Sequence, residues 1–262
     1  MHERLPARHA SWQDLLGSPQ HPAHIVQIYE SDDFLAAGVA LFAAEGLRRG
    51  EAVLLTGTPA HLRSVRDGLR AHGIDAGEAA AGSQLALFDV NEAIDTIVRG
   101  GAVDAGRFDR AVGKALASAA ASYPHVRWWG EISNVLQQRG DTRAALECEH
   151  LGNAAMRRHG VTLFCSYHAD KFDPDGYEAL LPALCKAHSH VIPTEDYVRH
   201  RLAVNRAIQE VVGEIRGPLL QSLLSWRGVA CDLPTSQALL FWLRETLPER
   251  FREVLSRAKA YA

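Results

Sequence analysis

Residues 24–58, HIVQIYESDDFLAAGVALFAAEGLRRGEAVLLTGT, decide the fold of this chain. The stretch opens with HIVQIYE, a short apolar run that fits a buried strand. A helical pattern follows, with Ser31 as its N-cap and Asp33 in its first turn. EAVLLTGT then returns as a second apolar strand. Because both runs are apolar throughout rather than alternating, they indicate a parallel sheet that is covered on both faces.

The same alternation of strand and helix continues along the chain. Three further strands are predicted at 83–90, 125–131 and 161–168. Further helices are predicted from Pro59 to Gly73, through 91–121 around a break at Gly100 and Gly101, and over 132–140, 141–160 and 177–191. This order predicts a layered α/β fold with a mostly parallel central sheet, followed by an all-helical C-terminal extension.

Three regions are expected: an N-terminal arm (1–22), an α/β domain (23–196) and a helical extension (197–262). Within the arm, Trp12, Leu15 and Leu16 could anchor the chain, the alternative being an ordinary frayed terminus. In the extension, residues 194–216 predict one helix with a coiled-coil-like apolar seam, which we expect to pack on a second copy or a partner, the alternative being packing on the α/β domain of the same chain. The seam consists of Tyr197, Val204, Ile208, Val211 and Ile215. Further helices are predicted around Leu219, Leu220, Leu223 and Leu224, around Leu239, Leu240, Trp242 and Leu243, and from Pro248 through Phe251, Val254 and Leu255.

Composition narrows the function classes. The 262 residues carry 28 Lys and Arg against 31 Asp and Glu, so the balance argues against a dedicated nucleic-acid binder. The four cysteines are scattered, which argues against a secreted disulfide scaffold. With neither a signal peptide nor a run long enough to span a membrane, we expect a cytoplasmic protein.

A ligand site is expected where the strands end. In parallel sheets the carboxyl ends of the strands lie at one edge, where ligands bind. The candidate ligand-binding residues are Tyr29, Glu30, Asp32, Glu131, Asn134, Tyr167, His188 and His190. The alternative for the residues at the strand ends is plain capping of the helices that follow.

Glu131 is the sharpest of these candidates. It follows Trp128 and Trp129, which would disfavour its ionised form unless an imidazolium compensates. His188 and His190 are the expected partners, and a ligand that broke or bridged the pair would move the helix that precedes them. The alternative is that both histidines only cap that helix.

Several chemistries are disfavoured. The first strand-to-helix turn reads YESDDFLAAG, which contains three acids but lacks the Lys and glycines of a phosphate-binding loop. We therefore expect no ATP hydrolysis and no enzyme. There is no Gly-x-Ser-x-Gly elbow, and Cys148, Glu149 and His150 are neighbours that do not face one another on a helix. No cofactor is expected.

A metal site remains an alternative, although it is not favoured. Thiolate and imidazole donors suit zinc or copper. The candidate ligands are Cys165, His168, Cys185, His188 and His190. Cysteine is equally common as a small core residue.

The landmarks together resemble a known family. They are HIVQIYESDD, EGLRRGE, AVLLTGT, GSQLALFDV, VRWWGEISNVLQQRGD, AALECEHLGN, TLFCSYHADKF and CKAHSHVIPTEDY. Over residues 20–200 the chain resembles the MEDS domain, the DcmR-like sensory domain of methanogen and methylotroph signalling proteins. The order of elements is also similar to the KaiC branch of RecA-like ATPases, which implies a RecA-like three-layer fold that lacks the phosphate loop.

The resemblance implies a sensor of a small organic molecule with a coupled output in signal transduction and transcription regulation. Family members often precede kinase or DNA-binding modules, but neither follows here, so the output is expected through a partner protein or a homodimer formed by the 194–216 helix. The alternatives are a ligand-free scaffold that acts on another regulator, and a metal-binding protein. We expect neither membrane nor direct nucleic-acid contact.

Overall fold

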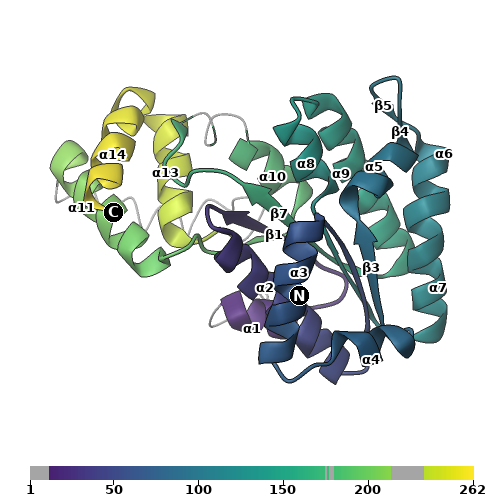
Figure 1. Ribbon diagram of the computed structural model, residues 1–262. Helices are drawn as coiled ribbons and strands as arrows, with labels where there is room; N and C mark the ends of the chain where they lie inside the picture. Colours follow the sequence, from purple (N-terminus) through teal and green to yellow (C-terminus); the bar gives the residue numbers. More distant parts are fainter. Residues whose placement is uncertain (1–11, 175, 177–179, 214–232) are drawn as a thin grey trace, which may run out of the picture.

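A six-stranded sheet forms the centre of the protein. The computed structural model describes residues 12–174, 176, 180–213 and 233–262. Every strand is parallel to its neighbours, and the strand order is β3-β2-β6-β7-β1-β8 (Figure 1). The strands are β1 (His24–Tyr29), β2 (Ala52–Gly57), β3 (Leu85–Asp89), β6 (Val126–Gly130), β7 (Thr162–His168) and β8 (His190–Val191). The predicted α/β fold is confirmed, with five strands at the predicted places and β8 in addition.

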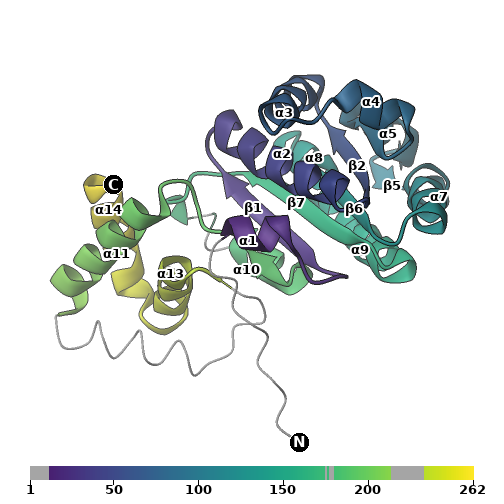
Figure 2. The ribbon, with the colours of Figure 1, turned by 90° about the horizontal axis from the view of Figure 1, so that it is seen from below.

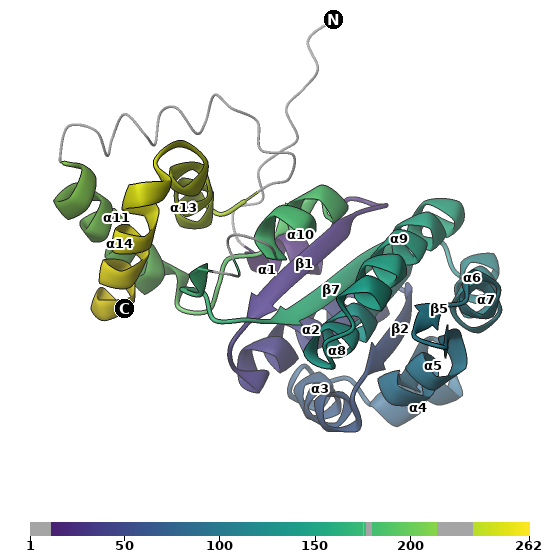
Figure 3. The same cartoon turned by 90° about the horizontal axis from the view of Figure 1, so that it is seen from above.

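Helices cover both faces of the sheet (Figures 2 and 3). One face carries α1 (Trp12–Gly17), α2 (Asp32–Arg48) and α3 (Pro59–Ala71), with α4 (Ala76–Ala81) beside β3. The other face carries α5 (Val90–Ile97), α6 (Ala105–Phe108), a π-helix (Asp109–Gly113), α7 (Lys114–Ser122), α8 (Ile132–Gln138), α9 (Thr142–His159) and α10 (Leu181–Ala187). A separate apolar core fills each side. Among the described residues, no helix combines the length and apolar composition that a membrane crossing requires.

The helix starts follow their local signals. The Ser31 hydroxyl accepts a hydrogen bond from the Phe34 amide (3.2 Å) and so caps α2. Thr58 caps α3 in the same way, with Pro59 in the first helical position. Asp89 caps α5. The predicted helix starts at Ser31 and Pro59 are confirmed.

One local prediction is refined and one was wrong. The predicted break at Gly100 and Gly101 lies between helices as expected, and it is the turn of a small antiparallel hairpin between β4 (Val98–Arg99) and β5 (Ala102–Val103). Their φ angles of +59° and +75° are the ones that such a turn needs and that glycine adopts without strain. The helix predicted to run to residue 191 ends at Ala187, and the chain then pairs with β1 as β8, because β1 would otherwise be an open edge.

The N-terminal anchor is formed by a helix and a buried arginine. Leu15 and Leu16 of α1 are buried, as expected of an anchor. The guanidinium of Arg127 on β6 is fully buried and donates to the carbonyls of Leu16 (2.7 Å) and Gly17 (3.0 Å). The same guanidinium pairs with Glu51. Burial by itself would raise the pKa of Glu51, but hydrogen bonds from His21 and Arg127 lower it to about 2.

The C-terminal extension forms a helical group beside the α/β domain (Figures 1 and 3). It contains α11 (Tyr197–Val212), α13 (Thr235–Thr246) and α14 (Pro248–Tyr261). The seam residues Val204 and Ile208 are buried, and α11 packs along α14 and α13 of the same chain. This part of the seam, which we expected to face a second copy or a partner, is thus covered from within. Ile215, Leu219, Leu220, Leu223 and Leu224 lie outside the described residues.

Candidate functional site

Glu131 lies at the carboxyl edge of the sheet and pairs with an imidazole. Its side chain is completely buried, and its Oε2 lies 2.8 Å from Nδ1 of His61 in the first turns of α3. Its Oε1 accepts the Thr58 amide. The imidazole partner is therefore His61, and the predicted pairing with His188 or His190 was wrong. Gly57 makes the approach possible, since a Cβ there would lie 2.5 Å from the Trp129 ring and 3.1 Å from Glu131 Oε1.

The pair belongs to a larger group that we call the edge cluster. It consists of Tyr29, Asp32, His61, Glu131 and Asn134. Nε2 of His61 lies 3.4 Å from Asp32 Oδ1, so the imidazole stands between two carboxylates. The hydrogen bond with Glu131 raises the pKa of His61. Burial raises the pKa of the nearby Tyr29, and the Glu131 charge adds to that shift. An imidazole and two carboxylates thus meet at the predicted strand-end position.

Asn134 connects the edge cluster to β7. Its Nδ2 donates to the Tyr29 hydroxyl (3.3 Å), and its Oδ1 accepts the His168 amide (3.1 Å). The rings of Tyr29 and His168 meet edge-on at 5.4 Å. Glu131 is at the N-cap position of α8, but its side chain makes no capping bond there, so capping does not explain its position.

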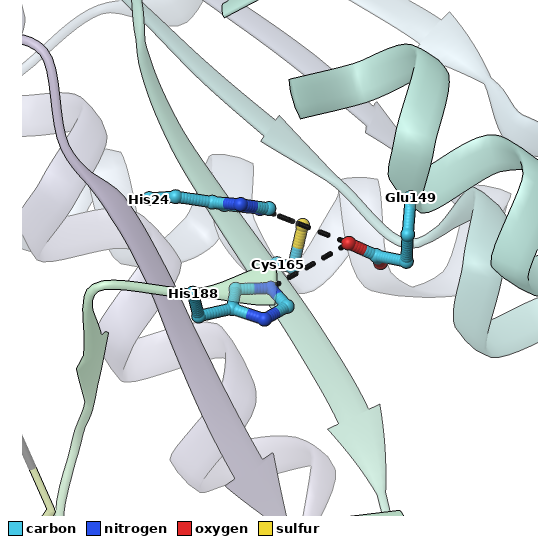
Figure 4. Close-up of side chains that lie close together, drawn as sticks. All are labelled: His24, Glu149, Cys165 and His188. Atoms are coloured by element: carbon cyan, nitrogen blue, oxygen red, sulfur yellow. Dashed lines mark hydrogen bonds and ion pairs between the residues drawn. The ribbon is translucent and has the colours of Figure 1, made fainter. Parts of the chain in front are cut away.

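A second group lies inside the protein, between the sheet and α9, and we call it the buried cluster (Figure 4). Its members are His24, Glu149, Cys165 and His188. They come from β1, α9, β7 and the end of α10, and one donor atom from each residue lies within 4.8 Å of the donor atoms of the other three. All four residues are buried. These are donor atoms of the kinds that bind transition metals.

The members of the buried cluster are held by neighbouring groups. The Tyr167 hydroxyl donates to Glu149 Oε1. Burial lowers the pKa of His24 to about 3, helped by the neighbouring His188, and burial lowers that of His188 to about 4. Burial also raises the pKa of the Cys165 thiol and of Tyr167, and the charge of Glu149 adds to both shifts.

The edge cluster and the buried cluster are separate. Alternate residues of a strand point to opposite faces, and Tyr29 packs in the core on the α2 side whereas Cys165 and Tyr167 pack in the core on the α9 side. His24 and Tyr29 occupy opposite ends of β1, about 16 Å apart at the rise of a strand. The expected single pocket is thus two groups, because strand parity assigns Tyr167 to the other face and His188 lies at the end of α10 on that face.

An open groove of about 920 Å³ runs from the end of β7 between α9 and α10. Tyr167 and His168 line its strand end, and Glu149 of the buried cluster lines its wall. Its apolar lining includes Leu146, Leu180 and Leu184, and its polar lining includes His150, Asn153, Arg157, Asp173 and Lys186. A volume of this size is that of a small-molecule site.

Three other candidates lie elsewhere. Glu30 accepts from the Lys171 amide (2.7 Å) and ammonium (3.0 Å) at the surface. His190 is on β8, where its Nδ1 lies 2.8 Å from the Ser189 hydroxyl. Cys185 is buried on α10 and is not a member of the buried cluster. Of the metal candidates named from the sequence, the structure brings together Cys165 and His188.

Sequence reasoning missed His61, His24 and Glu149. His61 sits three residues after the N-cap Thr58, where it reads as an ordinary helical residue. His24 is the first residue of an otherwise mostly apolar strand. A histidine in that position was the available sequence signal. Glu149 was considered only with its sequence neighbours, although its partners come from other elements.

The turn after β1, next to Asp32 of the edge cluster, also contacts the segment that leads into α11. The Ser31 hydroxyl donates to Glu195 Oε1 (2.6 Å), and the Ser31 amide lies 3.3 Å from Oε2. Glu195 precedes α11 by two residues. On the other side, Lys259 of α14 pairs with Asp170 after β7 (2.7 Å). The C-terminal helices are thus tied to the strand-end loops.

The sheet is parallel, polar groups lie at its carboxyl edge, and a groove lies beside it. These features define the class of α/β proteins whose site lies outside the strand ends. The chain belongs to the MEDS family, described as the methanogen/methylotroph, DcmR sensory domain, whose model matches residues 23–188. The match confirms the resemblance, and membership of a sensory family implies a role as a signalling sensor. None of the curated proteins matches the chain.

Proposed function

We propose that this protein is a non-catalytic sensor that binds a small organic ligand in the groove between α9 and α10 and relays the bound state to its C-terminal helices. The observation that carries this proposal is the groove itself, about 920 Å³ in volume, which starts at the end of β7 and has Glu149 of the buried cluster in its wall. Its mixed lining suits a ligand with an apolar body and a polar group. Family membership supports the sensory role.

The connections of α10 support a relay. This helix forms one wall of the groove, and the chain leaves it directly into β8 and then α11. A ligand that shifted α10 would therefore move β8 at the sheet edge and the start of α11. The Ser31–Glu195 contact would carry a change at the edge cluster to the same point.

The output would pass to a partner signalling protein, which for a DcmR-like sensor would be a transcription regulator. Val198 and Leu202, four residues apart on α11, have 63% and 60% of their surface exposed. They lie on one face of the helix and are the residues we propose for that contact. We also infer that the domain is a relative of KaiC-like ATPases without nucleotide turnover, since the turn after β1 is acidic.

Native mass spectrometry of the protein purified from its own cells tests the ligand proposal. We expect a small organic molecule that is retained in the native spectrum and released on denaturation. Ala183→Trp would fill the groove from α10 and abolish retention, whereas Ala154→Trp, on the exposed side of α9, would leave it unchanged. A wild-type protein that carries no small molecule, and whose melting temperature no compound in a panel of small organic acids and alcohols changes, would instead favour a ligand-free scaffold.

A further inference from the structure

We propose that the buried cluster is a site for a divalent transition-metal ion, with zinc as the best match. The donor set is one thiolate, two imidazoles and one carboxylate, which is a four-ligand combination that zinc accepts in tetrahedral geometry. This inference concerns residues inside the domain and does not depend on the ligand of the groove.

The distances between donor atoms fit such a site. Bonds of about 2.0–2.3 Å to zinc place neighbouring donor atoms of a tetrahedron about 3.3–3.8 Å apart. His24 Nε2 lies 3.2 Å from Cys165 Sγ and 3.9 Å from Glu149 Oε2. His188 Nε2 lies 3.7 Å from the same carboxylate oxygen. Only small side-chain shifts would be needed to place one ion at the centre.

The outer contacts orient both imidazoles toward that centre. His24 Nδ1 lies 2.9 Å from the Ala187 carbonyl, and His188 Nδ1 lies 2.9 Å from the Leu184 carbonyl. A carbonyl can only accept, so each Nδ1 carries the proton and each Nε2 presents its lone pair. This is the arrangement by which proteins fix the tautomer of metal-binding histidines.

The Glu149 carboxylate is also oriented by a hydrogen bond from a neighbouring residue. Tyr167 donates to Glu149 Oε1, which leaves Oε2 to face the cluster. A hydrogen-bonded outer shell of this kind, from a tyrosine and two main-chain carbonyls, surrounds three of the four donors.

Two donor atoms of the cluster are left unpaired. Within the part of the chain that the structure describes, Glu149 Oε2 and His188 Nε2 are buried side-chain atoms without a hydrogen-bond partner. Two acceptors that face each other at 3.7 Å cannot satisfy one another. A buried polar atom left in this way costs free energy, and a cation between the two removes that cost.

The charge also balances. Binding replaces the thiol proton of Cys165 by a metal–sulfur bond, and the proton leaves to solvent. The resulting thiolate and the Glu149 carboxylate supply two negative charges, which neutralise a divalent cation in this buried place. The ion would link β1, β7, α9 and the end of α10.

Cobalt substitution tests the site with the full chain, made without a histidine tag. We expect one Co²⁺ per chain, with the thiolate-to-cobalt charge-transfer absorption and the strong visible bands of tetrahedral Co²⁺. Cys165→Ser should remove the charge-transfer absorption. Glu149→Gln and His188→Gln should each weaken Zn²⁺ affinity by at least about tenfold, measured against a chromophoric chelator.

Cys148→Ser is the matched control, because Cys148 is a buried cysteine next to Glu149 that does not belong to the cluster. It should keep the full cobalt spectrum, and Zn²⁺ should raise the melting temperature of both this variant and the wild type. Circular dichroism identifies any variant that fails to fold, and the wild-type spectrum is decisive by itself. A wild-type chain without the thiolate absorption, or a Cys165→Ser chain that retains it, would overturn the proposal.

Discussion

The His61 side chain is the ionic partner of a buried carboxylate, that of Glu131. Glu131 is completely buried, and an isolated carboxylate there would be costly. His61 offsets that cost by a charge-assisted hydrogen bond at 2.8 Å. The same imidazole reaches Asp32 at the surface, so it joins the buried and the solvent-exposed carboxylate.

This pairing predicts a pH dependence of stability. Because Glu131 raises the pKa of His61 in the folded protein, folding is favoured by protonation of His61. The stabilisation is fully present below the ordinary histidine pKa of about 6.5 and is lost as the pH rises through the raised folded value. We expect the difference in unfolding free energy between wild type and His61→Gln to shrink from about pH 6 to about pH 9.

Urea denaturation across that range measures the effect, and an NMR titration of the His61 ring measures its pKa directly. His72→Gln is the control, since His72 lies at the end of the same helix and outside the edge cluster. A His61 midpoint at or below the ordinary value would contradict the prediction.

At the scale of elements, α1 depends on one buried ion pair. Arg127 donates to the carbonyls of Leu16 and Gly17 and pairs with Glu51. Replacing it by methionine would leave these carbonyls without their donor and Glu51 with His21 alone. We expect Arg127→Met to lower the unfolding free energy by about 3–5 kcal/mol and to expose α1 to limited proteolysis.

Chemical denaturation and mass mapping of the proteolytic cuts measure both effects. Arg63→Met, on the exposed side of α3, serves as the comparison and should change little. Should Arg127→Met be as stable as the comparison variant, the anchoring role of the ion pair would be wrong.

The turn between β1 and α2 makes a further prediction at this scale. Glu30, Asp32 and Asp33 surround the start of α2, and Ser31 already caps it. Negative charges at a helix start would repel a triphosphate, for which such a turn would need Lys and glycines. We expect phosphate release from ATP and GTP to equal the buffer background. Turnover above that background that disappears in Glu131→Gln would show an enzyme instead.

At the scale of the whole molecule, α11 has two apolar faces with different roles. Ile208 is buried against the chain's own helices, whereas Leu202 has 60% of its surface exposed. We expect Ile208→Asp to lower the unfolding free energy by about 3–5 kcal/mol, because it places a charge in the core of the helical group. Leu202→Asp should change it by less than about 0.5 kcal/mol.

Denaturation curves and light scattering of the two variants test this division. If α11 also joins a partner or a second copy, Leu202→Asp should abolish that association at unchanged stability. An Ile208→Asp protein as stable as wild type would show that the seam is not packed as described.

Local sequence patterns were sufficient to predict most of the fold. The apolar runs that became β1, β2 and β7, and the caps Ser31 and Thr58, were predictable because strand burial and helix capping act over a few neighbouring residues. The position of Tyr29 and Glu131 at one edge also followed, since parallel strands bring their carboxyl ends together.

Only the tertiary structure decided which side chains meet. His61 rather than His188 reaches Glu131, and His188 instead joins Glu149. These pairings depend on the face of the sheet to which a strand residue points and on where α3, α9 and α10 pack. Neither can be predicted from residues that are neighbours in sequence. The sequence by itself therefore determined the layers and the site edge, while packing between distant elements decided the composition of the two clusters.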